Sequence, residues 1–293
     1  MTDRARSTPL THAEEMAVGA RFGFGANWAR FLEHLDASRI QHAESSLLNM
    51  LALPSLEGLR FLDAGSGSGL FSLAALRLGA TVHAFDYDPQ SVACARELRR
   101  RYAVECGQPV ADALWHIEEG SVLDTAYLAG LGDFDIVYSW GVLHHTGDQW
   151  SAMNNVGQLV RPSGRLFVSI YNDQGSISRW WMIVKRLYNR NALARAVLIA
   201  LYTPYFIGLR WLYRKVTGRG KLERGMSLWY DMIDWLGGWP FQVARPEEVF
   251  RFFAARGFEL RAMTTAGRTG ACNEFVFERV REAQPQPGDP RTR

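Results

Sequence analysis

The sequence predicts a doubly wound α/β fold: a mostly parallel sheet of seven strands with helices on both faces and an antiparallel last strand. Three observations support this prediction. Short apolar runs alternate with segments of helical periodicity, a glycine-rich run follows the first apolar run, and the last two apolar runs follow one another without a helix. Parallel strands need a helical crossover, whereas two successive strands form a hairpin at a sheet edge.

The predicted strands are short apolar runs. The first, Leu59–Ala64, ends in a glycine cluster, as is typical of a buried parallel strand. The last two follow each other without a helix between them, as the strands of an antiparallel hairpin do. In chain order, the predicted strands cover residues 59–64, 81–86, 115–122, 134–140, 164–171, 258–265 and 273–280.

The predicted helices lie between these strands. The first covers residues 71–79 and ends at Gly79, and the second covers 89–103 with a proline near its start. A third lies near 148–160, and residues 246–258 form an amphipathic helix before the final strand pair.

We divide the chain into five parts on this basis. Residues 172–244 follow the fifth strand, where a short connection is expected, and we interpret them as an insertion. The last residues are polar and rich in proline, which is typical of a disordered tail. The parts are a helical cover (1–58), a core (59–171), the insertion (172–244), the rest of the core (245–281) and the tail (282–293).

The composition excludes several classes of protein. The 33 basic and 30 acidic residues give a net charge of +3, too balanced for a dedicated nucleic-acid binder. Three cysteines at unrelated spacings do not form a disulfide framework, and no Cys/His cluster suggests zinc. The first residues lack the apolar core of a secretory signal, so we expect a cytoplasmic protein.

The strongest chemical signal is the run from Asp63 to Gly69, with glycines at 65, 67 and 69. Glycine lets the backbone turn tightly and approach a ligand, and the helix that follows offers free N–H groups. Asp86 ends the second strand, where a carboxylate can accept both hydroxyls of a ribose. Together they predict a nucleoside cofactor at this edge of the sheet.

The spacing of the loop distinguishes between cofactors. The dinucleotide fingerprint requires glycine at position 70, where Leu70 stands. The run instead resembles motif I of the class I S-adenosylmethionine-dependent methyltransferases. The resemblance covers residues 59–170 and 246–280, and it implies a Rossmann-like fold with S-adenosylmethionine as cofactor.

The resemblance also implies roles for single residues. Asp63 would face the methionyl end of the cofactor, Asp86 would bind the ribose, and Tyr87 would lie against the adenine. Ser121 and the Val122 N–H would meet the adenine edge. The implied cofactor-binding residues are Asp63, Gly65, Gly67, Asp86, Tyr87, Ser121, Val122 and Trp140.

Two histidines follow the fourth strand, beside the expected position of the transferable methyl group. His144 or His145 could act as a general base for a hydroxyl acceptor, and we favour His144 because it lies nearer the strand end. Alternatively, both cap the helix start or bond to backbone. No second acid clusters with Asp148, so we expect no metal ion.

The insertion differs in composition from the rest of the chain. It contains eleven basic and four acidic residues, for a net charge of +7, and six of the ten tryptophans. Trp180, Ile183, Val184, Leu187 and Tyr188 form the apolar stripe of a basic amphipathic helix. Residues 196–209 are uncharged but too short to span a bilayer.

Two interpretations of the insertion remain open and are compatible with each other. It is a lid over the substrate site, or it also makes peripheral contact with an anionic membrane through residues 176–222. Before the first strand, aromatic residues are candidates for a cover over the cofactor site. The candidates for this cover are Phe22, Phe24 and Trp28, and the candidate substrate residues are Phe22, Trp28, Tyr171 and Asn172.

The resemblance implies methyl transfer to a small or lipid-linked organic acceptor, most simply O-methylation of a quinol, phenol or sugar hydroxyl. Three alternatives stay open: an RNA methyltransferase, a scaffold that binds S-adenosylmethionine without turnover, and a NAD-dependent oxidoreductase. The basic lid could imitate an RNA-binding strip.

Overall fold

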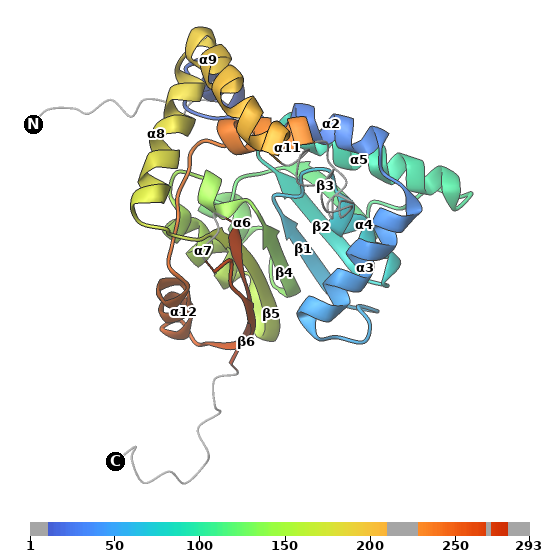
Figure 1. The fold of residues 1–293 in the computed structure, drawn as a ribbon. Helices are drawn as coiled ribbons and strands as arrows, with labels where there is room; N and C mark the ends of the chain where they lie inside the picture. Colours follow the sequence, from blue (N-terminus) through green and yellow to red (C-terminus); the bar gives the residue numbers. More distant parts are fainter. Residues whose placement is uncertain (1–10, 210–227, 268–270, 281–293) are drawn as a thin grey trace, which may run out of the picture.

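The computed structural model describes residues 11–209, 228–267 and 271–280. Its sheet has seven strands in the order β3-β2-β1-β4-β5-β7-β6 (Figure 1). Strands β1 to β5 are parallel, and β7 lies antiparallel between β5 and β6, which confirms the predicted fold class. The strands are β1 (Arg60–Ala64), β2 (Thr81–Asp86), β3 (Trp115–Glu119), β4 (Phe134–Trp140), β5 (Val160–Tyr171), β6 (Phe258–Thr264) and β7 (Cys272–Arg279).

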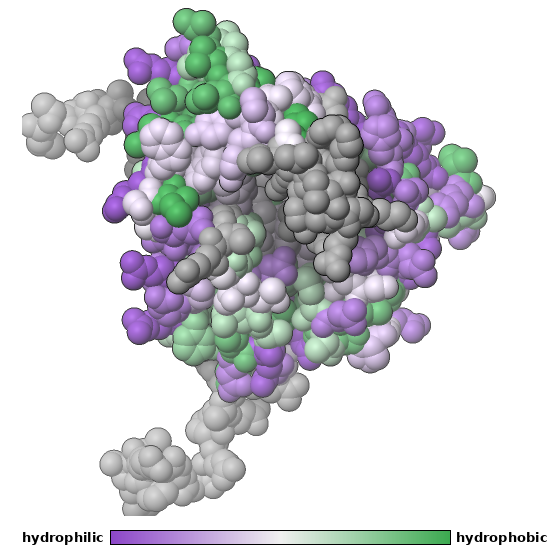
Figure 2. Space-filling view, in the orientation of Figure 1, coloured by the Kyte–Doolittle hydropathy of each residue, from purple (hydrophilic) through white to green (hydrophobic). Residues whose placement is uncertain are grey.

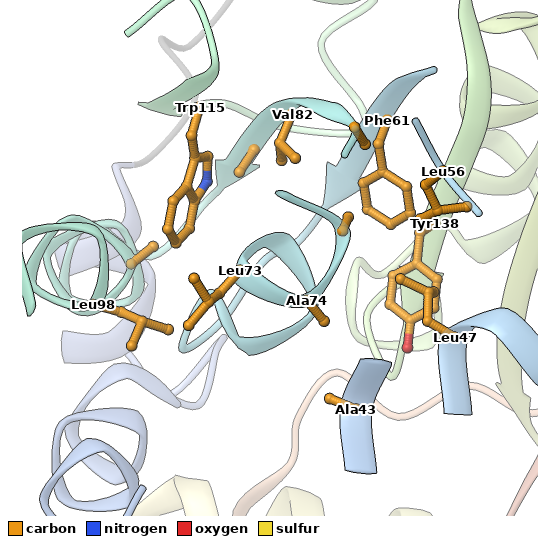
Figure 3. Close-up of a cluster of buried hydrophobic side chains, with 14 of the residues drawn as sticks. Ala43, Leu47, Leu56, Phe61, Leu73, Ala74, Val82, Leu98, Trp115 and Tyr138 are labelled. Carbon is orange, nitrogen blue, oxygen red and sulfur yellow. The ribbon is translucent and has the colours of Figure 1, made fainter. Parts of the chain in front are cut away.

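Helices cover both faces of the sheet, and each face has its own hydrophobic core. Figure 3 shows the core on one face, where Phe61 and Tyr138 of the sheet pack against Leu47 and Leu73 of the helices. The helices of this face are α2 (Gly25–Glu33), α3 (Ala37–Leu51), α4 (Leu70–Arg77) and α5 (Pro89–Glu105). The opposite core is built with α6 (Thr125–Ala129), α7 (Gln149–Gln158) and α12 (Pro246–Ala254).

Two elements begin at residues that also shape the site. Helix α4 begins after Gly69, whose left-handed backbone (φ 79°) turns the chain from β1 into the helix. Helix α5 is capped by Asp88, whose side chain accepts a hydrogen bond from the Gln90 N–H at 2.9 Å. Both helices therefore point their N-termini toward the carboxyl ends of the strands.

The structure differs from the sequence prediction at several boundaries. The third strand ends at Glu119 rather than at residue 122, so Ser121 and Val122 belong to a loop. The fifth strand begins at Val160, four residues earlier than predicted. The N-terminal part also contains α1 (His12–Ala17), and η1 (Leu143–His145) forms a short 3₁₀ turn after β4.

Within the described ranges, the insertion contains α8 (Ser176–Arg190), α9 (Ala192–Thr203), the π-helical segment η2 (Pro204–Leu209) and α11 (Leu228–Gly237). Val184 and Tyr188 of α8 pack with Met232 and Leu236 of α11 in a separate small core. Within the described ranges, none of the helices is long and apolar enough to cross a membrane. The predicted tail (282–293) and residues 210–222 of the predicted membrane contact lie outside the described residues.

The predicted apolar stripe of α8 is only partly buried, which corrects the sequence interpretation. Trp180, Ile183 and Leu187 are 56%, 52% and 40% exposed. The predicted basic face instead contributes Lys185, which is fully buried. Its Nζ donates a hydrogen bond to the Trp235 carbonyl oxygen and lies 4.4 Å from the ring centroid of Trp235, and its burial lowers its pKa to about 7.

Candidate active site

A cavity of about 1000 Å³ opens at the carboxyl edge of the sheet. One wall comes from the ends of β1 to β4, through residues such as Gly65, Asp86 and Trp140. The other wall comes from the N-terminal helices and the insertion, including Trp28 and Trp181. The cavity therefore lies at the position where open α/β sheets bind their ligands.

The glycine loop forms the floor of the cavity and leaves no room for side chains. Gly65 and Gly67 have φ values of 87° and 53°, in the left-handed region. A Cβ at Gly65 would lie 2.4 Å from Val142, and one at Gly67 would lie 2.9 Å from the Trp28 ring. The loop thus offers bare backbone to a ligand, as predicted, and Trp28 covers it.

Asp86 fixes this loop from the end of β2. Its Oδ2 accepts a hydrogen bond from the Gly67 N–H, and its Oδ1 accepts one from the Asp88 N–H, both at 2.9 Å. Burial raises the pKa of its carboxyl to about 6. The carboxylate also lines the cavity, so its remaining lone pairs can accept hydrogen bonds from ribose hydroxyls.

Asp63 does not reach the cavity, contrary to the role that the resemblance implies. Its side chain is buried beneath the loop, and its Oδ2 accepts a hydrogen bond from the Ser72 hydroxyl of α4 at 2.5 Å. Burial raises the pKa of Asp63 to about 7. The structure therefore places this acid between β1 and α4 rather than beside the methionyl group.

The residues expected around an adenine lie together on the next part of the wall. Tyr87, Ser121 and Val122 all line the cavity. Arg21 places its guanidinium 4.7 Å from the centroid of the Tyr87 ring, a contact that sequence reasoning did not find. The glycine cradle, the carboxylate and this apolar wall fit an adenosine-containing cofactor in shape and chemistry.

Trp140 ends β4 with its side chain on the cavity wall. Its indole Nε1 donates a hydrogen bond to Glu274 Oε1 of β7 at 2.9 Å. This bond joins the end of β4, across β5, to the antiparallel hairpin and fixes the orientation of the ring. Trp140 therefore has the position that the sequence predicts for it.

The structure reverses the preference between the two histidines. His144 is fully buried, with its ring 4.0 Å from that of Tyr171, and it does not line the cavity. His145 does line the cavity, although it is only 7% exposed. A base that acts on a bound acceptor must be within its reach, so His145 is the better candidate.

The surroundings of His145 determine its tautomer and its charge. Nδ1 lies 2.6 Å from the Pro240 carbonyl oxygen, which can only accept, so Nδ1 carries the proton and Nε2 carries the lone pair. Burial and the charge of Lys185 lower the pKa of His145 to about 3. The imidazole is therefore a neutral acceptor at physiological pH.

The N-terminal cover and the lid meet above this histidine. Arg21 Nη1 donates a hydrogen bond to the His145 carbonyl oxygen at 3.0 Å, and the Phe22 N–H donates one to the Trp239 carbonyl oxygen at 2.9 Å. The predicted substrate residues Phe22, Trp28 and Tyr171 line the cavity, as does Phe24 of the predicted cover. Sequence reasoning missed further lining residues, among them Trp181, Phe206, Asp234 and Trp235.

Asn172 does not belong to the cavity, which corrects its prediction as a substrate residue. Its amide donates a hydrogen bond to the Gly267 carbonyl oxygen at 2.9 Å and accepts one from Asn273 at 3.1 Å. The asparagine pair therefore joins the end of β5 to the hairpin. Tyr171, one residue earlier, points to the opposite side and reaches the cavity.

Comparison with known proteins is consistent with this geometry. Residues 62–166, from β1 into β5, match the family model described as a methyltransferase domain. The matched segment contains the glycine loop, Asp86 and the seven-residue strand β4 that leads to the histidines. Residues 62–166 therefore match a methyltransferase domain, and the strand order agrees with the class I S-adenosylmethionine-dependent methyltransferase fold.

Curated relatives of this chain carry the name ubiquinone biosynthesis O-methyltransferase. The protein from Methylocella silvestris is 37% identical over 40% of this chain and 41% of its own length. The protein from Rhizobium etli is 29% identical over 76% of this chain and 69% of its own length. The first of these matches thus spans less than half of the relative.

Solved structures share the fold at low identity. An O-methyltransferase family protein from Burkholderia thailandensis superposes with a TM-score of 0.50 at 12% identity, over 88% of this chain and 63% of that one. A chain from the Haloferax volcanii complex of Trm112 with its candidate methyltransferase gives 0.51 at 16% identity, over 90% and 99%. These likenesses support the methyltransferase fold alone.

Asp86→Ala should weaken S-adenosylmethionine binding by about 2 kcal/mol, roughly thirtyfold in Kd, because two charge-assisted hydrogen bonds to the ribose are lost. Isothermal titration calorimetry measures the affinity. Glu33→Ala, which removes an exposed carboxylate from α2, serves as the control and should bind like the unmodified protein. Unchanged affinity in Asp86→Ala would contradict the ribose assignment.

The buried imidazole of His145 should make the protein sensitive to acid. Its pKa is about 3 in the folded state, below the ordinary value of 6.5, so the unfolded chain binds the extra proton between these values. This contribution to the free energy of unfolding is present above pH 6.5 and is lost as the pH falls toward 3. His145→Gln cannot charge and should lose less stability over this range.

Urea unfolding at a series of pH values measures this difference. Asp63, Asp86 and Lys185 are present in both proteins, so the difference between the two proteins reports on His145 together with its interaction with the adjacent His144. Parallel curves of unfolding free energy against pH would show that His145 is not kept neutral by burial.

Proposed function

We propose that this protein transfers the methyl group of S-adenosylmethionine to an oxygen atom of an aromatic, small or lipid-linked acceptor such as a quinol or phenol. The proposal rests on the part of the cavity that lies beyond the glycine loop. Beyond the glycine loop, aromatic rings of the cover and the lid line the cavity together with two polar side chains, His145, whose Nε2 carries the lone pair, and Asp234. Such a pocket selects a flat apolar molecule with a hydroxyl group.

The chemistry asked of the protein is modest. Bound S-adenosylmethionine supplies an electrophilic methyl group on a sulfonium. Nε2 of His145 accepts a hydrogen bond from the acceptor hydroxyl and so aims the oxygen lone pair. As the oxygen–carbon bond forms, the carbon–sulfur bond breaks with its electron pair going to sulfur, and the hydroxyl proton passes to Nε2 and then to water. A weak base suffices, because the hydroxyl proton becomes strongly acidic as its oxygen bonds to the methyl group.

The names of the curated relatives support an oxygen acceptor of the quinone class. The relatives from Methylocella and Rhizobium are both named for O-methylation in ubiquinone biosynthesis. The cavity volume of about 1000 Å³ leaves space for an aromatic acceptor beside the cofactor. The chemical class of the methyl acceptor, an aromatic hydroxyl compound with or without a lipid tail, belongs to this proposal.

A membrane-facing lid would suit an acceptor with a lipid tail, and we include peripheral membrane contact in the proposal. Leu193, Val197 and Leu201 of α9 are 76%, 56% and 66% exposed, and Figure 2 shows a hydrophobic surface where α9 projects from the molecule. Exposed basic residues flank them, among them Arg186, Arg190 and Arg195. This composition is typical of helices that bind anionic interfaces.

Two further exposed apolar residues of the lid lie at the cavity. Ile177 of α8 and Tyr205 of η2 line the cavity, and they are also 51% and 59% exposed. A lipid-linked acceptor could thus enter from the bilayer surface between these residues without crossing water. RNA would need stacking residues within a basic strip, whereas this surface is predominantly aliphatic.

The function can be tested by incubating the protein with S-adenosylmethionine labelled on the methyl group and with extracts of lipids and soluble metabolites. We expect a labelled, lipid-extractable phenolic ether and stoichiometric S-adenosylhomocysteine. Label in RNA would favour the alternative methyltransferase. Cofactor binding without any product would favour a scaffold.

His145→Asn should lower kcat at saturating cofactor by about 100-fold, the lower end of the usual contribution of a general base. Asparagine can replace the bond from Nδ1 to Pro240, but it removes the acceptor at Nε2. His145→Gln restores an acceptor near Nε2 without a titratable group. If glutamine recovers most of kcat, the residue orients the hydroxyl; if neither variant changes kcat, His145 has no role in the reaction.

The membrane proposal predicts that the protein floats with anionic phosphatidylglycerol vesicles at low salt. Replacing Leu193, Val197 and Leu201 together by glutamate should leave it in the soluble fraction, because apolar insertion and attraction to the anionic surface are both lost. Leu114→Glu, at a residue 50% exposed before β3, is the matched control. An unmodified protein that stays in the soluble fraction would contradict membrane contact.

A further inference from the structure

Three potential metal ligands lie together on the sheet, away from the cavity described above. His83 of β2 and His116 of β3 are direct neighbours in the parallel register. Glu118 lies two residues after His116 and therefore on the same face of β3. The two histidines are 33 positions apart in the sequence, so they do not form a recognisable Cys/His sequence motif.

The distances between these side chains suit a single small ion. His83 Nε2 lies 2.9 Å from Glu118 Oε1, and His116 Nε2 lies 3.4 Å from Glu118 Oε2. One ligand atom from each residue falls within 4.8 Å of the other two. The ligands of a tetrahedral zinc are about 3.3 Å apart, given bonds of about 2.0 Å, so small side-chain rotations complete the geometry.

The chemistry of the three groups also suits zinc. Two imidazoles and one carboxylate are a common ligand set for borderline divalent cations.

Tyr127 supplies the outer contact that metal-binding carboxylates usually have. Its hydroxyl donates a hydrogen bond to Glu118 Oε1 at 2.7 Å, which orients the carboxylate toward the histidines. Tyr127 itself is held in place by its contact with the ring of Phe85, 5.4 Å away between centroids. The carboxylate is therefore preorganised by a residue that is not a ligand.

The space beside the cluster can hold water, and its charged side chains already have partners of their own, which are carbonyl oxygens for Arg60 and a guanidinium for Asp112. A cavity of about 400 Å³ is lined by His83, His116, Arg60 and Asp112. Arg60 donates hydrogen bonds to the Asp133 and Leu131 carbonyl oxygens, and Asp112 pairs with Arg99. A water molecule can thus complete the coordination from this side.

We propose that His83, His116 and Glu118 bind a zinc-type divalent cation with water as the remaining ligand. The ion would join the edge strand β3 to β2 just before Asp86 and the Ser121 loop, which line the cofactor cavity. It is a structural site, distinct from the methyl-transfer centre, and it does not depend on the proposed acceptor. Its expected effect is on the stability of this edge of the sheet.

Zinc titration of the intact, chelator-treated protein tests the proposal, with competition by a chromophoric chelator to measure affinity. We expect one equivalent of zinc to bind and to raise Tm. The double variant His83→Ala/His116→Ala should lose this equivalent, and Tyr127→Phe should bind about 10- to 100-fold more weakly. Cobalt should give the visible absorption of a tetrahedral site.

His42→Ala, which removes an exposed histidine from α3, is the matched control and should bind like the unmodified protein. Each variant should have a cooperative unfolding transition without metal, so that loss of binding is not loss of fold. The proposal is overturned if the intact protein binds no zinc, or if the double variant retains the same stoichiometry and affinity.

Discussion

The carboxylate of Asp86 is the constraint on which the cofactor site depends. It binds the Gly67 N–H of the glycine loop with one oxygen and the Asp88 N–H with the other. Asp88 in turn caps α5 and accepts a hydrogen bond from the Gly25 N–H at the start of α2, at 2.8 Å. That helix carries Trp28 over the same loop. Hydrogen bonds from backbone N–H groups to the carboxylates of Asp86 and Asp88 thus fix both the floor and the cover of the cavity.

The acceptor side is assembled from parts that are distant in the sequence. Arg21 of the N-terminal segment and Pro240 at the end of the lid both bind His145. Lys185 is buried behind it among the rings of Tyr171, Trp235 and Phe241. A neutral histidine and a buried lysine together make this region costly to charge, which favours apolar acceptors. The lid therefore affects the electrostatic potential of the site and also forms part of its wall.

The sequence predicts what depends on local signals and misses what depends on tertiary contacts. Apolar runs followed by glycine or aspartate place Gly65, Asp86 and Tyr87 correctly at the strand ends. The side chains of Asp63 and Asn172 lie away from the cavity, unlike the sequence prediction. Neighbouring strand residues face opposite sides of the sheet, and sequence spacing alone does not decide which residue faces the cavity. The burial of Lys185 depends on rings about fifty residues away, and the His83–His116 pair depends on strand register.

We infer that Asp86 and the glycine loop hold the cofactor so that its methyl group points toward His145. A crystal structure of the complex with S-adenosylhomocysteine tests it most directly. We expect the ribose hydroxyls within hydrogen-bond distance of Asp86, the adenine between Tyr87 and Ser121, and the sulfur directed toward His145. A ribose away from Asp86, or a sulfur directed away from the lid, would contradict it.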